Sequence, residues 1–172
     1  MKTTFLSLAL CGLCATAMGQ KIDNSTVTTL DLDRYLGQWY EIARYDHSFE
    51  RGLVGCKAEY SMRDDGKIKV LNSGYLNTLD GTYKESTGKA KAKKDGNAGQ
   101  LQVSFFGPFY SDYNIMELAP DYSYSVVGSS SPKYLWILSR SPQLTTATKE
   151  KILRNLRQRG YDTTKLIWVK QK

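Results

Sequence analysis

Residues 37–45 read GQWYEIARY, and this stretch decides the fold. It is dense in aromatic and branched residues, a composition typical of a β-strand. The next stretch, residues 54–62, has apolar side chains at every second position, as in a strand with one buried face. Those side chains belong to Val54, Cys56, Ala58, Tyr60 and Met62. The pattern therefore predicts two successive strands.

The same pattern continues toward the C-terminus, with turn residues between the strands. Asp65-Gly66 follows residues 54–62 and precedes the strand at residues 67–75, and an Asp-Gly pair between two alternating runs is a strong hairpin signal. The remaining predicted strands cover residues 82–93, 101–106, 110–118, 122–127 and 134–139. Eight short strands at roughly regular spacing indicate an antiparallel sandwich or barrel.

Residues 145–159 carry the one helical pattern. Thr148, Ile152 and Leu156 recur four apart on one face, and Thr145 is suited to cap the start of the helix. Gly160 is suited to end it. The narrow apolar stripe predicts that the helix packs against the outside of the sheet. A last short strand is predicted at residues 166–169.

Residues 1–19 are predicted to be a secretory signal peptide. Lys2 precedes an apolar run at residues 5–14, and residues 17–19 (AMG) place small side chains where a signal peptidase cleaves. The apolar run is too short to span a membrane. We therefore expect an exported protein, either periplasmic or secreted.

A lipid anchor is the alternative fate of this leader. Leucine precedes both Cys11 and Cys14, whereas lipoprotein processing needs a small residue there, so anchoring to the outer membrane is ranked as less probable. After removal of the leader, residues 20–31 form an N-terminal arm and residues 32–172 form one domain.

The composition of the 172 residues is globular, with 41% hydrophobic and 24% charged residues. A single histidine, His47, and three cysteines argue against a multi-histidine metal site and against a histidine-based triad. No glycine loop that would bind phosphate occurs, and we expect neither a metal nor a cofactor. Without residues 1–19, Cys56 is the one cysteine, and the net charge falls from +7 to +6.

Three short motifs occur in order along this layout. Gly37-Gln38-Trp39 fits a G-x-W motif on the first strand, Ser111-Asp112-Tyr113 resembles a T-D-Y motif, and Arg140 stands at the end of the eighth strand. With these motifs the chain resembles the lipocalins. The wording of residues 39–53 and 103–118 is similar to the branch that holds the bacterial outer-membrane lipocalin and apolipoprotein D.

The resemblance covers residues 32–172 and implies an all-β fold. Its core is an eight-stranded antiparallel up-and-down lipocalin barrel, with one C-terminal α-helix packed outside and a short final strand. Closure would also remove the strand edges that invite aggregation.

The resemblance gives the motif residues structural roles. Trp39 is expected to plug the closed end of the barrel, and Arg140 is expected to lie across its indole in a cation–π contact. Gly37 is expected to let the backbone come close. Asp112 and Tyr113 of the second motif belong to the same structural set.

The resemblance also implies a cup with one open end, an apolar lining and a few polar anchors. Tyr110 and Trp136 are the first candidates for ligand contact, since Trp136 lies in mid-strand and Tyr110 lies near a rim. Alternation adds weaker candidates for the lining, namely Ala43, Tyr45, Ala58, Tyr60 and Tyr75. Ordinary packing, inside a filled barrel or under the helix, is the alternative for each.

Glu41 and Arg44 bring charges into the first strand. If the two side chains are buried, each needs a partner, and a cation in the cup would favour a carboxylate or phosphate on the ligand. A pair on the surface is the preferred interpretation.

The leading functional interpretation is a protein that binds, stores or transports a small hydrophobic ligand, such as a fatty acid, a lysophospholipid or a similar amphiphile. Burial of each methylene group contributes about 0.8 kcal/mol, so an unspecialised apolar cup can hold an acyl chain. The positive charge would favour contact with an anionic membrane surface. The protein is expected to be a monomer or a homodimer.

The sequence gives less support to two other classes of function. A lipocalin-fold enzyme would use Cys56 as nucleophile with His47 as base, but nothing in the sequence brings these two residues together. Residues 84–94 (KESTGKAKAKK) are basic, yet no aromatic residues are interleaved for stacking on bases. We therefore expect no nucleic-acid partner and no catalytic activity.

Overall fold

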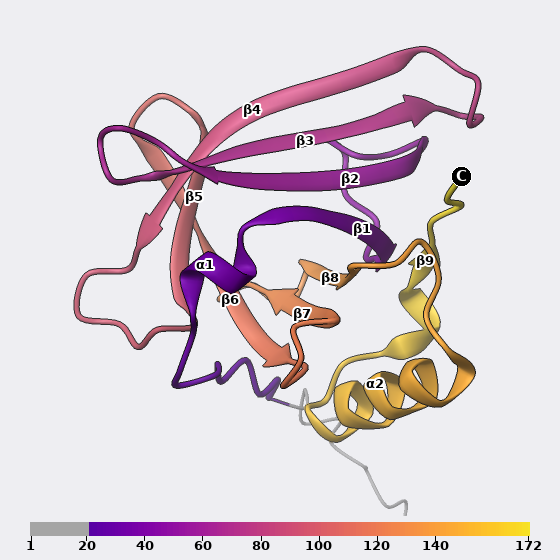
Figure 1. The fold of residues 1–172 in the computed structure, drawn as a ribbon. Helices are drawn as coiled ribbons and strands as arrows, with labels where there is room; N and C mark the ends of the chain where they lie inside the picture. Colours follow the sequence, from indigo (N-terminus) through magenta and orange to yellow (C-terminus); the bar gives the residue numbers. More distant parts are fainter. Residues whose placement is uncertain (1–20) are drawn as a thin grey trace, which may run out of the picture.

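The structure, a computed structural model, describes residues 21–172, and the predicted signal peptide at residues 1–19 lies outside them. In this part of the chain nine strands form one sheet in the order β2-β3-β4-β5-β6-β7-β8-β1-β9. An additional pairing between β1 and β2 closes the first eight strands into an antiparallel up-and-down barrel, so the predicted fold class is confirmed (Figure 1).

Most elements lie within a few residues of their predicted positions. The strands are β1 (Gly37–Arg44), β2 (Leu53–Met62), β3 (Ile68–Leu76), β4 (Tyr83–Ala92), β5 (Gln100–Phe106), β6 (Phe109–Leu118), β7 (Tyr124–Gly128), β8 (Leu135–Ser139) and β9 (Ile167–Trp168). The helices are α1 (Leu32–Tyr35), α2 (Thr146–Gln158) and the 3₁₀ turn η1 (Thr163–Lys165). No helix within residues 21–172 is long and apolar enough to cross a membrane.

The two ends of the barrel differ because successive strands run in opposite directions. The short helix α1 lies at one end, which we call the closed end, together with the β2–β3, β4–β5 and β6–β7 connections. At the other end, which we call the open end, lie the connections at residues 45–52, 77–82, 107–108 and 129–134.

Strand β1 has a bulge that reverses which of its residues face inward. Tyr40 and Glu41 pair with Ser139 and Leu138, but the register with β8 shifts between Glu41 and Ala43. The extra residue is Ile42, and one inserted residue exchanges the two faces of the strand beyond it. Before the bulge, Trp39 and Glu41 face the interior; after it, the inward residue is Arg44.

Helix α2 covers one outer side of the barrel, next to β8 and β9 (Figure 1). Thr145 caps its start, since its side chain accepts a hydrogen bond from the Thr148 backbone, as the sequence predicted. The helix buries Ile152 and Leu156 fully. These side chains belong to an outer core between helix and barrel that also contains Ala43, Tyr45, Val126, Leu135 and Ile137.

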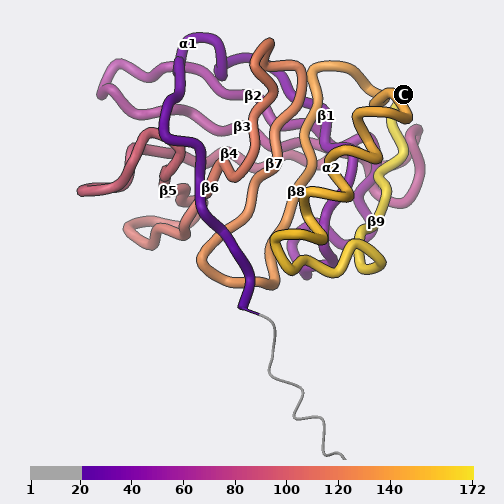
Figure 2. The backbone as a smooth tube through the Cα atoms, turned by 90° about the horizontal axis from the view of Figure 1, so that it is seen from below, coloured from indigo at the N-terminus to yellow at the C-terminus, as the bar shows by residue number. Residues whose placement is uncertain are grey.

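The N-terminal arm is extended and packs on the barrel. Figure 2 shows it running across the surface into α1. The backbone N–H of Val27 donates to the Ile115 carbonyl, and the Val27 carbonyl accepts from Gly99 N–H at 3.1 Å. Arg159 at the end of α2 donates to the carbonyls of Asp23 and Ser25, so the arm is fixed at both the barrel and the helix.

The closed end is sealed around Trp39, which is completely buried. Its indole N–H donates to the Tyr35 carbonyl at 2.8 Å, and Arg140 lies over its ring at 3.8 Å. The Arg140 guanidinium also donates to four backbone carbonyls, those of Arg34, Tyr35, Leu36 and Gln38, at 2.7–3.1 Å. One side chain therefore ties α1 and the start of β1 to the end of β8.

Backbone conformation, rather than close contact with a neighbouring side chain, explains the glycine at position 37. Its φ is +90°, a region that residues with a Cβ rarely adopt. A Cβ there would lie 3.5 Å from Arg140 Nη1, which is ordinary van der Waals contact. The expected close approach is therefore absent, and the left-handed φ at Gly37 accounts for the glycine.

Replacing Arg140 by alanine should destabilise the barrel strongly. The change removes a cation–π contact and the guanidinium donor of the Arg34, Leu36 and Gln38 carbonyls, while the Tyr35 carbonyl keeps the Trp39 indole N–H. The free energy of unfolding should therefore fall by about 2–4 kcal/mol. Urea unfolding measures this loss. The matched control is Arg154→Ala, because Arg154 is exposed on α2 and contacts only Glu150 at 4.0 Å among the ion pairs of the described residues. An equal effect of both substitutions would contradict the prediction.

Candidate functional site

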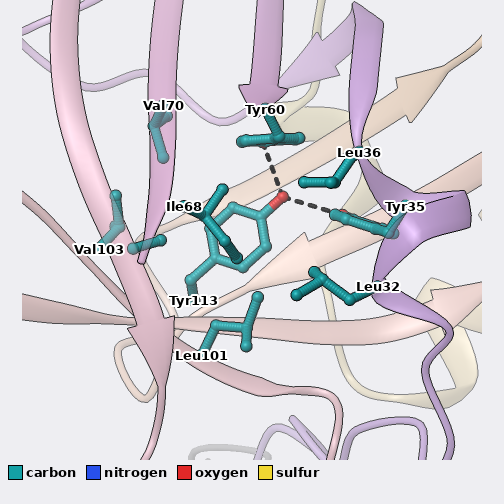
Figure 3. A pocket seen from close by; sticks show the side chains of 10 residues that line it. Leu32, Tyr35, Leu36, Tyr60, Ile68, Val70, Leu101, Val103 and Tyr113 are labelled. Atoms are coloured by element: carbon teal, nitrogen blue, oxygen red, sulfur yellow. Dashed lines mark hydrogen bonds between the residues drawn. The ribbon is translucent and has the colours of Figure 1, made fainter. Parts of the chain in front are cut away.

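The interior at the closed end is packed by apolar side chains around a small pocket (Figure 3). The pocket volume is about 10 Å³, room for at most one water molecule. Ten residues line it: Leu32, Tyr35, Leu36, Tyr60, Ile68, Val70, Ala90, Leu101, Val103 and Tyr113. This part of the barrel is therefore filled, and a larger ligand must lie nearer the open end.

Three tyrosine hydroxyls meet in the middle of this packing. The hydroxyl of Tyr113 lies 2.9 Å from that of Tyr35 and 2.8 Å from that of Tyr60, as Figure 3 shows. Tyr35 also lies 3.2 Å from Ser125 Oγ. Burial raises the pKa of Tyr35 to about 12 and raises those of Tyr60 and Tyr113 further. These groups are neutral hydrogen-bonding partners that fix the floor of the interior.

Toward the open end, the inward-facing side chains of β3 to β6 are no longer buried. The register of these strands places Asn72, Ser86 and Val103 on the same face as the buried Val70 and Ala90. Asn72 and Val103 are half-buried, and Ser86 is exposed. Inward-facing side chains that reach solvent show that the close packing of the closed end does not continue into this half of the barrel.

A buried polar cluster occupies the opposite side of the open end. Arg44 Nη1 donates to Glu41 Oε1 at 2.6 Å, and Arg44 Nη2 donates to the Glu50 carbonyl at 2.7 Å. Trp136 Nε1 donates to Glu50 Oε2 at 3.0 Å, and His47 Nε2 lies 2.9 Å from the same oxygen. Because Glu50 and His47 belong to the connection at residues 45–52, the cluster holds this segment against the barrel.

The cluster is not fully satisfied by the protein. Among the described residues, Arg44 Nε and both ring nitrogens of His47 are buried without a hydrogen-bond partner of acceptable angle. Rings of Phe49, Tyr134 and Trp136 surround His47, at centroid distances of 3.9, 6.0 and 5.2 Å. The site thus joins aromatic surface to polar groups that can still form hydrogen bonds.

Burial and neighbouring charge control the protonation of this cluster. Burial is the main factor that raises the pKa of the Glu41 carboxyl, the Glu50 carboxylate raises it further, and Arg44 opposes both. The thiol of Cys56 lies 3.6 Å from Arg44 Nη1, and burial raises its pKa to about 12. Cys56 is therefore a neutral thiol near neutral pH and a poor nucleophile.

The sequence matches a family model over nearly the whole described chain. The family is described as a lipocalin-like domain, and it matches residues 30–171. The chain belongs to the lipocalin family. Within residues 21–172 this lipocalin has no group of three or more His, Cys, Asp or Glu side chains placed to hold a metal ion.

Two relatives place this lipocalin in the predicted branch. The outer membrane lipoprotein Blc of Vibrio cholerae is 47% identical over 146 residues, which cover 84% of this chain and 85% of the relative. Apolipoprotein D of Mus musculus is 33% identical over 186 residues, covering 99% of this chain and 96% of the relative. The resemblance to the bacterial and apolipoprotein D branch is confirmed.

A solved structure supports the barrel fold. Insecticyanin from the tobacco hornworm Manduca sexta is similar with a TM-score of 0.68 and 26% identity. The match covers 90% of this chain and 87% of the insecticyanin chain.

The structure brings only some of the candidate ligand residues into the interior. Ala58 and Tyr60 pack in the inner core, and the half-buried Trp136 joins the polar cluster. Ala43 and Tyr45 lie instead in the outer core beneath α2. Their inward placement assumed unbroken alternation from Trp39, and the bulge at Ile42 removes that assumption.

Tyr75 and Tyr110 also lie away from the interior. Tyr75 is out of phase with the inward-facing Val70, and its ring lies 3.9 Å from Lys172 Nζ. Tyr110 is out of phase with the inward-facing Tyr113, and Lys91 Nζ lies over its ring at 4.4 Å. Only the structure shows that Val70 and Tyr113 line the pocket, and alternation from these residues puts Tyr75 and Tyr110 on the outer face.

The surface pair preferred for Glu41 and Arg44 is wrong. Both residues are buried, at 5% and 2% exposure, and they pair inside the barrel. Sequence reasoning also missed His47 and Glu50 as interior groups, because they lie in a connection and carry no strand pattern. The one sign of the buried pair in the sequence was the i, i+3 spacing of Glu41 and Arg44. Residues three apart on a strand share a face only if a bulge lies between them.

Glu41→Gln should change how stability depends on pH. A carboxyl whose pKa is raised on folding contributes stability below its ordinary value of 4.5, and that contribution is lost as pH rises through the folded-state pKa. Glutamine does not titrate, so the variant should gain stability relative to the wild type as pH rises above 4.5. One pKa unit corresponds to about 1.4 kcal/mol, so a relative gain of more than about 1 kcal/mol is expected.

Urea midpoints across this pH range test the effect. The control is Glu59→Gln, because Glu59 is exposed on β2. A constant difference between Glu41→Gln and the wild type at all pH values would contradict the assignment.

Proposed function

We propose that this lipocalin binds a fatty acid, a lysophospholipid or a similar amphiphile in the open half of its barrel. Membership of the family supports the binding of small hydrophobic ligands in general. The observation that carries the narrower proposal is the row of inward-facing side chains on β3 to β6 that are not buried, although the closed end is filled.

The polar cluster suits the head group of such a ligand. An acyl tail would lie along Val103 and Phe105, while the head group would lie near Trp136. Arg44 Nε and His47 Nδ1 would offer it hydrogen bonds that the protein leaves unused. Ligands of this kind need few specific contacts, because apolar burial supplies most of the affinity.

We infer that the protein works by binding rather than by catalysis. The alternative, an enzyme with Cys56 as nucleophile, receives no support, because a neutral buried thiol beside Arg44 lacks an activating base. The contacts of His47 among the described residues are with Glu50 and surrounding aromatic rings.

We also propose that residues 1–19 direct export and are removed, leaving the arm and one lipocalin domain. Several relatives, among them those of Vibrio cholerae and Escherichia coli, are named outer membrane lipoproteins. Their names support export, and they give no support to ranking a lipid anchor as the less probable fate. A monomer or homodimer remains a prediction.

Native mass spectrometry with lipid extraction, on protein purified from its own host, tests the proposal directly. One acyl compound per barrel is the expected result. A ligand-free protein that also fails to bind added fatty acid would overturn the proposal.

Filling the open half of the barrel should block binding. Val103→Trp places an indole among inward-facing side chains, so affinity for cis-parinaric acid, measured by its fluorescence, should fall by about tenfold or more, which corresponds to about 1.4 kcal/mol. Gln102→Trp is the matched control, since Gln102 pairs with Lys91 on the outer face of the same strand. Equal affinities of the two variants would argue against a ligand at this position.

A further inference from the structure

The hairpin that joins β5 and β6 ends in two uncovered phenylalanines. Phe106 is 81% exposed and Phe109 is 79% exposed. They are cross-strand partners, so their side chains share one face of the hairpin. Gly107, with φ +56°, and Pro108 form the turn between them, and Ser104 Oγ donates to the Gly107 carbonyl at 3.1 Å. We call residues 106–109 the aromatic tip.

Large apolar side chains side by side at a fixed turn mark an interaction surface rather than packing. The tip is built as part of the sheet, so the two rings are displayed without further ordering. Covering them would remove apolar area from water at little conformational cost.

A row of lysines flanks the tip on the outer face of the sheet. Lys91 and Lys89 lie over the ring of Tyr110 at 4.4 and 5.9 Å, and Tyr110 directly follows Phe109. Lys69 is the cross-strand partner of Lys89. Within residues 21–172 none of the three lysines forms an ion pair. The row, which we call the lysine row, therefore keeps its charge for an external anionic partner.

The tip also stands where the barrel wall is incomplete. The register of β4 with β5 runs only from Lys89–Ser104 to Ala92–Leu101. In the described chain, residues 83–88 of β4 pair with β3 but have no partner on β5. The ladder of the hairpin shifts register between Val103 and Phe106, so the tip extends β5 and β6 past the last residue of β5 that pairs with β4.

We propose that the aromatic tip inserts into the surface of an anionic lipid bilayer, with the lysine row against the lipid head groups. Aromatic side chains favour the boundary between head groups and acyl chains, and lysines are attracted to anionic lipids. A second copy of the chain fits this surface less well, because its own lysine row would repel the first. The docking needs no ligand inside the barrel and so goes beyond the proposed function.

Sedimentation with lipid vesicles tests the tip. The wild type should pellet with vesicles of phosphatidylcholine and phosphatidylglycerol, and Phe106→Ser with Phe109→Ser should reduce its partition coefficient by about tenfold or more. Met62→Ser is the matched control, because Met62 is 48% exposed but lies at the closed end. Failure of the wild type to pellet, or an equal loss with Met62→Ser, would overturn the proposal.

The charge requirement has its own test. Lys89→Glu with Lys91→Glu should abolish the preference for phosphatidylglycerol over pure phosphatidylcholine, and added salt should weaken wild-type binding. Arg154→Glu with Arg157→Glu on α2 makes the same change in net charge elsewhere and should leave most of the preference. Equal effects of the two pairs would mean that only net charge matters, and would overturn the role of the lysine row.

Two cross-checks separate this proposal from the one on ligand binding. The tip double variant should bind cis-parinaric acid like the wild type, whereas Val103→Trp should still pellet with vesicles. Circular dichroism verifies that each variant is folded. If the tip substitutions change the oligomeric state in gel filtration and leave vesicle binding unchanged, the tip is an interface between copies and the bilayer proposal fails.

Discussion

Strand β1 forms hydrogen bonds with both β2 and β8, and this double pairing makes the sheet a barrel. Its first half pairs with β2 up to Tyr40, and its second half pairs with β9 from Ala43 onward. The bulge at Ile42 lies where β1 passes from one neighbour to the other. Closure of the barrel depends on this strand. So do the inner core and the outer core under α2, because β1 contributes side chains to both.

The same bulge determines the electrostatics of the interior. Because it turns Arg44 inward, Glu41 and Arg44 lie on one face and form a buried pair. A buried pair needs further partners, and the connection after β1 supplies them through Glu50 and its carbonyl. The connection at residues 45–52 directly follows β1 in the sequence. Its Glu50 therefore reaches both Arg44 of β1 and Trp136 of β8.

The regular features of the fold could be predicted from the sequence, whereas the bulge in β1 and the side chains of the connection after it could not. Alternation and Asp-Gly turns predicted the strands, the capping by Thr145 predicted the start of α2, and three motifs predicted the family. The same alternation misplaced Ala43 and Tyr45, because the one sign of a bulge in residues 37–45 is the i, i+3 spacing of Glu41 and Arg44. His47 and Glu50 stayed hidden for another reason: a connection has no period, and only its fold brings its side chains to Trp136.

The short pairing between β4 and β5 bears on the length of ligand that the barrel could hold. A barrel with a continuous wall limits a ligand to the length of its interior. Here residues 83–88 form no ladder bonds with β5, so the wall has a seam beside them. For the acyl ligand proposed above, that seam would give a tail longer than the interior a lateral exit. Tolerance of chain length would then follow from the strand pairing, independently of the side chains that contact the ligand.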